Sequence, residues 1–272
     1  MVSIIIPCYN TSQFVQQAVD SAKVQTGVKT EIIVVDDGSN QETKVVLDKI
    51  DDIILITQKN LGQSAARNAG IKRASGKYIF MLDSDDYVEP SFCEKALEIL
   101  KTKENVKVVS SYTRRFIEEK TLDIFKPKGG SLGDFLLENY ASGGAYCARK
   151  DELIMAGLYD EDMKKGFEDW EFFIRLLRLD GSAHIIPEVL YHYRKHHNST
   201  SVSANLIKYE LQKYIYCKHR DLYMQHFEDF VNHLLGKIER EEKEKIKNTH
   251  RLEFRLGRTI LNPLRRIKSM FK

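Results

Sequence analysis

The chain has 272 residues, of which 42% are hydrophobic and 30% are charged, and its net charge is +3. This composition is typical of a globular protein, and a chain of this length can bury a full core, so we expect one α/β domain with appendages. No run of about 18 consecutive apolar residues occurs, which excludes a helix long enough to span a membrane.

The four cysteines lie far apart in the sequence, without a Cys-x-x-Cys motif or a nearby group of histidines. This spacing favours reduced thiols in a cytosolic compartment over a disulfide framework or a zinc site. The chain starts with a strand-like run at residues 2–7, without a basic segment that leads into a longer apolar one, so no signal peptide is expected. The cysteines are Cys8, Cys93, Cys147 and Cys217.

Short apolar runs alternate with helical patterns over the first 83 residues. We expect strands at residues 2–6, 31–35, 53–57 and 78–82, and helices at residues 13–22 and 63–74. Because the connections are short, right-handed crossovers and a parallel, doubly wound sheet are implied. In such a sheet the ligand crevice lies beyond the carboxyl ends of the strands.

Chemically active side chains follow the expected strands at these carboxyl ends. The run at residues 78–82 ends in three carboxylates, which repel one another, and a divalent metal with an anionic ligand would relieve that repulsion. The gathering of these side chains at the carboxyl ends of the strands is the main indication of function in the first half of the chain. The residues are Tyr9 after the first strand, Asp36 and Asp37 after the second, and Asp83, Asp85 and Asp86 after the fourth.

The second half adds further strands, a glycine-containing loop and an acidic cluster. Gly143 and Gly144 allow close approach of the backbone to whatever lies in the crevice. Glu168 and Asp169 fall at the start of an amphipathic helix, whose N-terminus favours ionised carboxylates. We expect strands at residues 106–112, 116–125, 146–148, 184–186 and 190–193, and helices at residues 132–140 and 151–156.

Beyond residue 203 the pattern is helical without strands, and residues 250–272 carry seven Lys or Arg side chains against one carboxylate. A basic amphipathic tail of this kind favours an anionic membrane surface, at about 1 kcal/mol per cation near the surface. The alternative is a helical cap or an oligomer contact with a solvated basic face. No nucleic-acid partner is expected, and the oligomeric state stays open.

Five separated stretches together resemble the family 2 glycosyltransferases of GT-A fold, over roughly residues 1–201. They are SIIIPCYN, EIIVVDDGS, NLGQSAARNAGIKRASGKYIFMLDSDD, GFEDWEFFIRL and YRKHHNSTS. The resemblance implies an α/β, Rossmann-like mixed sheet, mainly parallel and flanked by helices, with a helical C-terminal extension. Residues 1–86 would form a nucleotide-binding half, 87–202 an acceptor half, and 203–272 the extension with its basic tail.

The activity that this resemblance implies is an inverting transfer from a nucleotide-diphosphate sugar, usually a UDP-sugar. The acceptor would be a hydroxyl of a saccharide or a lipid-linked saccharide, and Mn²⁺ or Mg²⁺ would bridge the diphosphate. The Gln-x-x-Arg-Trp motif of processive synthases is absent, since Trp170 is the only tryptophan. The implied setting is a bacterial cell-envelope or exopolysaccharide pathway, in the cytoplasm or at the inner face of the cytoplasmic membrane.

The resemblance also assigns the donor site residue by residue. Pro7 and Tyr9 would line the uracil and ribose pocket, with Tyr9 stacked on the base. Asp36 would accept a hydrogen bond from the uracil ring, and Arg67 would face the nucleotide. The full set implied for binding the nucleotide-sugar is Pro7, Tyr9, Asn10, Asp36, Asp37, Arg67, Asp83 and Ser84.

Metal binding and catalysis are assigned in the same way. Asp85 would be the main metal ligand of the Asp-x-Asp motif, and Asp83 would contact the ribose or the metal. His196, in the loop at residues 194–201, would meet the metal or the diphosphate. Asp169 would be the general base, with Glu168 beside it and the acceptor. Two neighbours, Asp86 and His197, are expected to be structural.

Simpler interpretations exist for each of these residues. An Asp-Ser-Asp sequence at a strand end often only caps a turn or a helix. Glu168 and Asp169 could cap their helix and pair with Arg175, and His196 could be a solvated surface group. Tyr9 could be a packed loop aromatic, and Arg67 a cation on a helix surface.

Two other functions agree with parts of the sequence. A sugar-phosphate nucleotidyltransferase would usually have a Gly-rich, basic loop straight after the first strand, and PCYNTSQF lacks one. A non-catalytic nucleotide-sugar binding module is disfavoured by the intact Glu-Asp-Trp and Asp-Ser-Asp clusters. The donor sugar and the acceptor are left open, because residues 110–166 contain no readable code.

Overall fold

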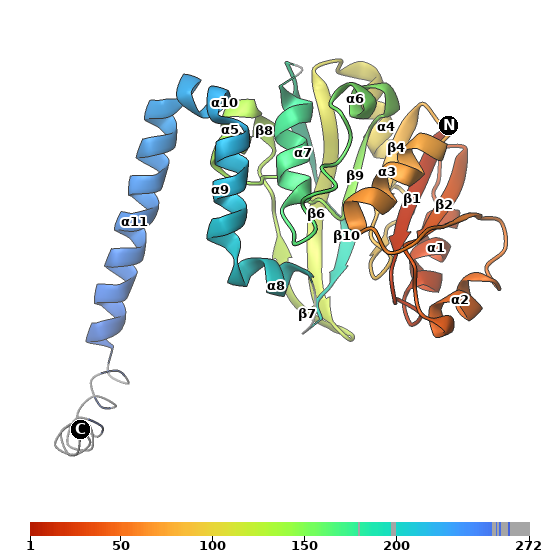
Figure 1. The fold of residues 1–272 in the computed structure, drawn as a ribbon, viewed down its shortest axis with the longest axis horizontal. Coiled ribbons are helices and arrows are strands. Elements are labelled where there is room, and N and C mark those ends of the chain that lie inside the picture. Colours follow the sequence, from red (N-terminus) through yellow and green to blue (C-terminus); the bar gives the residue numbers. More distant parts are fainter. Residues whose placement is uncertain (179, 197–199, 252–253, 255, 257–260, 262–272) are drawn as a thin grey trace. The chain divides into compact units, whose positions relative to one another are not determined.

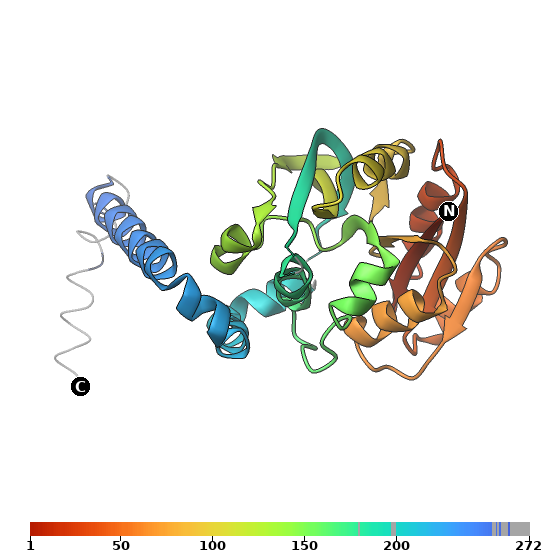
Figure 2. The ribbon, with the colours of Figure 1, turned by 90° about the horizontal axis from the view of Figure 1, so that it is seen from above.

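The computed structural model describes residues 1–178, 180–196, 200–251, 254, 256 and 261 (Figure 1). The chain divides into two compact units, Met1–Arg220 and Asp221–Lys272. The first unit contains a mixed sheet with helices on both faces, which is visible from above in Figure 2. The strands follow one another across the sheet in the order β3-β2-β1-β4-β9-β6-β10-β5.

The first four strands form the predicted parallel half of the sheet. β1 lies between β2 and β4, and its pairing with β2 runs without a shift from Val2 opposite Thr30 to Cys8 opposite Asp36. All four strands therefore end at the same edge, which places the side chains that follow them in one region. The strands are β1 (Val2–Cys8), β2 (Thr30–Asp36), β3 (Ile54–Thr57) and β4 (Tyr78–Leu82).

Helices α1 (Val15–Lys23), α2 (Gln41–Leu47) and α3 (Gln63–Arg73) connect these strands. The small residues of α3 allow the close approach to the sheet that the sequence predicts, because a methyl group at Gly70 would overlap Ile5 on β1. Helix α2 was not expected. It starts where the Asn40 side chain accepts a hydrogen bond from the Thr43 amide at 3.0 Å, a standard N-cap.

The second half makes the sheet mixed. β9 (Ala145–Arg149) runs antiparallel to β4, whereas β10 (Ser182–Arg194) runs parallel to β6 (Val106–Ile117). The prediction of two short strands at residues 184–186 and 190–193 is wrong, because β10 is one strand with register shifts between Ile186 and Tyr191. The strand predicted at residues 116–125 is divided between β6 and β7 (Lys120–Phe125). The short strands are β5 (Tyr87–Val88) and β8 (Gly130–Ser131).

Helices of the second half place the acidic cluster. Glu168 is the first residue of α7, as the sequence predicts, and the preceding Phe167 has a positive φ of 63° that turns the chain into the helix. These helices are α4 (Phe92–Thr102), α5 (Leu132–Leu137), α6 (Lys150–Met155) and α7 (Glu168–Leu177).

The first unit extends to Arg220, beyond the boundary predicted at residue 202, and so includes α8 (Thr200–Leu206) and α9 (Lys208–Lys218). The second unit contains most of α10 (Arg220–Gln225) and α11 (Phe227–His250), which has no buried residue. None of the described helices has the length and apolar character needed to cross a bilayer. Most of the tail at residues 250–272 lies outside the described residues, so its association with a membrane stays a prediction.

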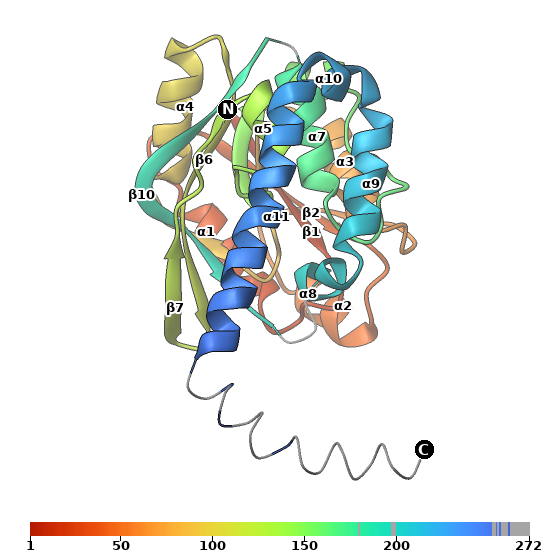
Figure 3. The same ribbon diagram turned by 90° about the vertical axis from the view of Figure 1, so that its left-hand side faces the viewer.

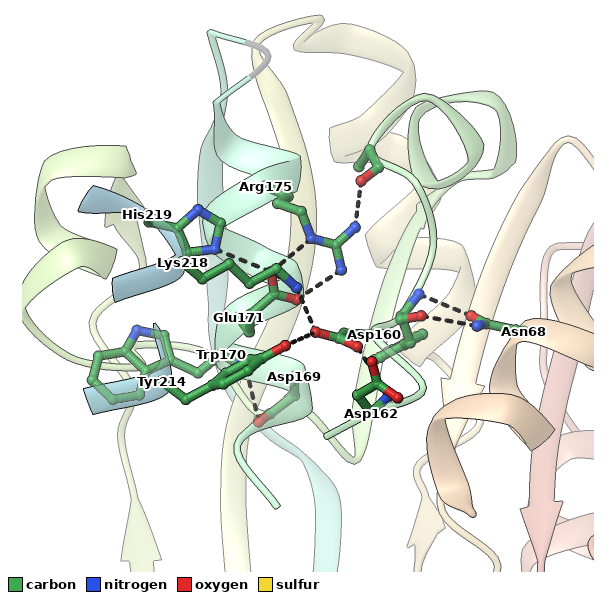
Figure 4. Close-up of polar contacts among 12 residues, drawn as sticks. Asn68, Asp160, Asp162, Asp169, Trp170, Glu171, Arg175, Tyr214, Lys218 and His219 are labelled. Carbon is green, nitrogen blue, oxygen red and sulfur yellow. Dashed lines mark hydrogen bonds and ion pairs between the residues drawn. The ribbon is translucent and has the colours of Figure 1, made fainter. Parts of the chain in front are cut away.

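Helix α9 lies beside α7 (Figure 3), and a buried polar cluster joins the two helices (Figure 4). Glu171 on α7 is fully buried and accepts hydrogen bonds from Arg175 at 2.7 and 2.8 Å. Lys218 Nζ and His219 Nε2 lie 2.9 and 3.0 Å from its Oε1. Burial alone would raise the pKa of Glu171, but the hydrogen bonds from His219 and Arg175 outweigh it and lower the pKa to about 2.

Replacing Glu171 by leucine should therefore destabilise the protein by about 3 kcal/mol, because the partly buried Arg175 and Lys218 lose their fully buried counter-ion. Since the pKa of Glu171 is depressed, its contribution is present above its ordinary value of 4.5 and is lost as the pH falls toward 2. Urea unfolding at pH 7 and at pH 3 measures the difference from wild type, which should shrink at pH 3. Glu210→Gln, an exposed change on α9, is the control, and equal stability of both variants at pH 7 would contradict the prediction.

Candidate active site

A buried arginine connects the two halves of the site. Arg67 on α3 is 2% exposed, and its Nη2 donates to Asp83 Oδ1 at 2.8 Å, just beyond the end of β4. Its Nη1 donates to Glu168 Oε1 at 2.7 Å, at the start of α7. One guanidinium thus links the floor of the predicted donor site to the helix that carries the predicted base.

The environment of Arg67 keeps it charged. Burial lowers its pKa, but the neighbouring carboxylate of Asp83 and that of Glu168 raise it, and the pKa stays well above its ordinary range. The guanidinium carbon lies 5.2 Å from the centre of the Tyr159 ring, a cation–π distance. The interpretation of Arg67 as a cation on a helix surface is therefore wrong.

Asp169 is held by two hydrogen bonds. Its Oδ2 accepts from Asn139 Nδ2 at 2.8 Å, and its Oδ1 accepts from the Trp170 amide at 2.8 Å. Burial of the carboxyl raises its pKa to about 6, the charge of Glu168 adds to this, and Arg67 opposes it. A carboxylate that titrates near neutrality can take a proton from a hydroxyl more readily than an ordinary aspartate.

The alternative that Glu168 and Asp169 pair with Arg175 does not hold. The two hydrogen bonds from Arg175 to a carboxylate go to Glu171 instead, one turn further along α7. Glu168 is occupied by Arg67, and Asp169 by the Asn139 side chain. The two acids at the start of α7 therefore face the site rather than the outer part of their helix.

The glycine loop before β9 lies against two acids, Asp83 and Asp169. A methyl group at Gly143 would overlap Asp169 Oδ2, and one at Gly144 would come within 2.8 Å of Asp83 Oδ2. The Gly144 carbonyl also accepts a hydrogen bond from the Asp83 amide at 3.0 Å. The close backbone approach that the sequence predicts is thus an approach to Asp83 and Asp169.

The loops after β1 and β2 form the predicted nucleotide side. Pro7 is buried in β1, whereas Tyr9 is 49% exposed, so the interpretation of Tyr9 as a packed aromatic is wrong. Asn10 has a positive φ of 55°, and it joins the two loops through hydrogen bonds with the Ser39 hydroxyl at 3.1 Å and the Asn40 amide at 2.7 Å. An exposed ring on a fixed loop is suited to stacking on a base.

Asp36 and Asp37 are both buried but have different surroundings. Asp36 accepts one hydrogen bond at Oδ1, from the Ser39 amide at 2.9 Å. Asp37 accepts from the Gln58 side chain at 2.7 Å and from the amides of Leu61 and Gly62 at 2.9 and 2.8 Å. Both oxygens of Asp37 therefore support the loop that leads into α3, whereas Asp36 accepts a side-chain hydrogen bond from the described residues at Oδ1 alone.

The Ser-Asp-Asp sequence after Asp83 is held by hydrogen bonds with the loop after β1 and with β10. Thr11 Oγ1 donates to Ser84 Oγ at 3.0 Å, from the loop after β1. Asp86 is buried and accepts from the Tyr191 hydroxyl and from the Arg194 amide at 2.7 Å, which fits its predicted structural role. Arg194 Nε also donates to the Asp85 carbonyl at 3.0 Å, so the backbone here is fixed.

The surroundings of Asp85 fit a divalent cation. His196 Nε2 lies 3.5 Å from Asp85 Oδ2 and has no hydrogen-bond partner among the described residues, although the His196 side chain as a whole is 31% exposed. Within the described part of the chain, no three His, Cys, Asp or Glu side chains gather as a protein-only metal site. Mg²⁺ and Mn²⁺ are commonly held by one or two carboxylates together with phosphate oxygens. His197 lies outside the described residues.

Three residues of the site were not predicted. Asn139 contacts Asp169, Gln63 Nε2 lies 3.3 Å from Asp83 Oδ1, and Arg194 fixes the Asp85 and Asp86 backbone. Asn139 lies in none of the five stretches that resemble the family, so nothing in the sequence indicates it. Gln63 lies in the stretch NLGQSAARNAGIKRASGKYIFMLDSDD, which could have pointed to it. Arg194 is the second residue of the YRKHHNSTS stretch, and that position is a signal that could have identified it.

The glycosyl transferase family 2 model matches residues 3–142 of the chain. An uncharacterized glycosyltransferase of Rickettsia prowazekii is 31% identical over 261 residues, which cover 92% of this chain and 76% of that protein. One of Haemophilus influenzae is 30% identical over 79% of this chain and 72% of its own length. The chondroitin synthase of Pasteurella multocida is 42% identical over 108 residues, which are 38% of this chain and 11% of that protein.

Solved structures show the same fold. S. aureus TarS 1-349 in complex with UDP-GlcNAc matches with a TM-score of 0.67 at 19% identity, over 85% of this chain and 72% of that one. Its complex with UDP matches with a TM-score of 0.60 at 20% identity, over 71% of this chain and 60% of that one. The predicted mixed α/β sheet of GT-A type is confirmed, and the chain belongs to glycosyl transferase family 2.

Proposed function

We propose that this protein is an inverting, metal-dependent glycosyltransferase that moves a sugar from a UDP-sugar to a hydroxyl of a saccharide or lipid-linked saccharide. One observation carries the proposal. Arg67 binds Asp83 and Glu168 at once, so the acids at the end of β4 lie beside the acids at the start of α7. Family membership and the likeness to TarS, whose structures hold UDP and UDP-GlcNAc, support the donor class.

The donor would bind across the carboxyl ends of the parallel strands. Tyr9 offers an exposed ring to the base, and Asp36 has an oxygen available for the uracil N–H. Asp85 and His196 would hold Mn²⁺ or Mg²⁺, which would neutralise charge on the departing diphosphate. Asp83 is engaged by Arg67, so its part is to fix the floor of the site and to contact the ribose or the cation.

Asp169 would accept the proton of the acceptor hydroxyl. Each of its oxygens accepts one hydrogen bond in the structure, so each keeps a further lone pair for that proton. The charge on neighbouring Glu168 is balanced by Arg67, which leaves Asp169 as the free base of the pair. We place the acceptor among cell-envelope or exopolysaccharide saccharides, in line with the chondroitin synthase relative.

The pH dependence of transfer follows from the raised pKa of Asp169. Only the ionised carboxylate can accept a proton, so kcat should rise with pH along an acid limb whose midpoint lies near 6. Initial rates between pH 4.5 and 8, with the donor saturating, measure this limb. A rate that is already constant from pH 4.5 upward would contradict the role of Asp169.

A donor panel tests the proposed function. UDP-, GDP- and dTDP-sugars are incubated with the full chain, with and without Mn²⁺, and release of the nucleoside diphosphate and the shift in melting temperature are recorded. We expect a UDP-sugar to give both signals, and Mn²⁺ to increase them. Pyrophosphate release from UTP and a sugar 1-phosphate, with no signal from any nucleotide-sugar, would instead indicate a nucleotidyltransferase.

A further inference from the structure

The side chain of Asn139 lies in the loop between α5 and β9 and reaches the start of α7. Its Nδ2 donates to Asp169 Oδ2 at 2.8 Å, while its Oδ1 accepts from the Ala141 amide at 3.3 Å. The second bond fixes which end of the amide faces the carboxylate, because the oxygen is occupied within its own loop. Asn139 thus presents an N–H to Asp169 from a segment 30 residues away in the sequence.

The same segment surrounds Asp169 in a second way. Gly143 packs so closely on Asp169 Oδ2 that a methyl group there would overlap it. Thr113 Oγ1 and Ser142 Oγ lie 2.9 Å apart and tie the segment to β6. Besides the hydrogen bond from the Trp170 amide in its own helix, the Asp169 carboxylate is therefore oriented from outside that helix, by a loop that is itself anchored to the sheet.

We propose that Asn139 is the positioning residue of the base: its amide holds the Asp169 carboxylate in one orientation and stabilises its ionised form. This inference rests on the proposed function, in which Asp169 takes the proton of the acceptor. A carboxylate that can rotate would present its free lone pairs to the acceptor hydroxyl only part of the time. A hydrogen bond to the charged form also favours ionisation.

The other groups that face Asp169 act differently. Glu168 raises its pKa through its charge, and Arg67 lowers it but gives its Nη1 and Nη2 to Glu168 and Asp83. The hydroxyls of Tyr146 and Tyr159 bond to each other. Among the described side chains, Asn139 is the one that donates a hydrogen bond to Asp169.

The experiment compares Asn139→Leu, which removes the donor at similar volume, with Asn139→Gln, which keeps an amide. The pKa of Asp169 is measured in the full chain by carbon-detected NMR of labelled aspartates, assigned with Asp169→Asn. We expect Asn139→Leu to raise this pKa by about one unit, as expected for the loss of a charge-assisted hydrogen bond, and Asn139→Gln to restore most of the difference. Asn105→Leu, at an exposed position, is the control and should leave the pKa unchanged.

Kinetics give a second readout. For Asn139→Leu we expect kcat to fall roughly tenfold and the acid limb to move to higher pH, while the affinity for UDP-GlcNAc measured by calorimetry is unchanged. If Asn139→Leu does not fold, Asn139→Ala, which adds no bulk, takes its place. An unchanged Asp169 pKa in the folded variant overturns the inference. Because the NMR titration needs no turnover, it distinguishes this failure from a failure of the proposed function.

Discussion

Replacing Asp169 by asparagine is expected to slow sugar transfer by about 10² to 10⁴-fold, the usual contribution of a general base. The change keeps the shape of the side chain but removes the group that accepts the proton. Donor binding should persist, because the predicted nucleotide contacts come from Tyr9, Asp36 and the end of β4. Initial rates of UDP release and calorimetric titration with the donor measure the two effects separately.

Asp229→Asn, the same chemical change at an exposed position of α11, is the control for this experiment and should retain full activity. A second variant, Glu168→Gln, removes the counter-ion of Arg67 but keeps the base. The pH profile of the transfer rate should therefore distinguish Glu168→Gln, which still has Asp169 to titrate, from Asp169→Asn. If Asp169→Asn transfers sugar at the wild-type rate while it binds the donor, the assignment of the base must be abandoned.

Replacing Asp85 by alanine should remove the effect of the metal on donor binding. We expect the affinity for UDP in the presence of Mn²⁺ to fall roughly a hundredfold, because the variant lacks the carboxylate that would hold the metal beside His196 Nε2. Chelation with EDTA should weaken UDP binding to the wild type by a similar factor. In Asp85→Ala, EDTA should have little further effect.

Calorimetric titration of both proteins with UDP, with Mn²⁺ or with EDTA, provides these four affinities. His196→Ala should give an intermediate loss, since Asp85 would remain as a ligand. The metal proposal fails if UDP binds wild type and Asp85→Ala equally well and chelation changes neither affinity. The hydrogen bonds from the Arg194 amide to Asp86 Oδ1 and from Arg194 Nε to the Asp85 carbonyl would still hold the backbone in these variants.

The set of side chains at the carboxyl edge of the sheet could be predicted, because local sequence patterns are sufficient to place them there. Apolar runs of strand length, short connections and the handedness of crossovers place Asp36 and Asp83 at one edge without knowledge of any long-range contact. The start of α7 at Glu168 follows in the same way from the apolar periodicity after it.

What sequence reasoning missed depends on contacts between distant segments. The sequence predicts that Arg67 faces the nucleotide, but nothing local in it indicates the ion pair with Glu168, 101 residues later. Asn139 has no local signal because its partner lies on another helix. The sequence predicts the same nucleotide-binding role for Asp37 as for Asp36, yet three hydrogen bonds to residues 58–62 give Asp37 a supporting role. The single strand β10 was divided in two because its register shifts interrupt the alternation.

The stereochemistry of transfer tests the proposed mechanism most directly, and it can be measured without knowledge of the acceptor. An α-linked UDP-sugar that the donor panel identifies is hydrolysed by the full chain while proton NMR follows the anomeric signals in real time. A single displacement, with Asp169 as the base, predicts that the β-anomer of the free sugar appears first and then equilibrates. Initial release of the α-anomer would mean retention of configuration and would contradict the proposed mechanism.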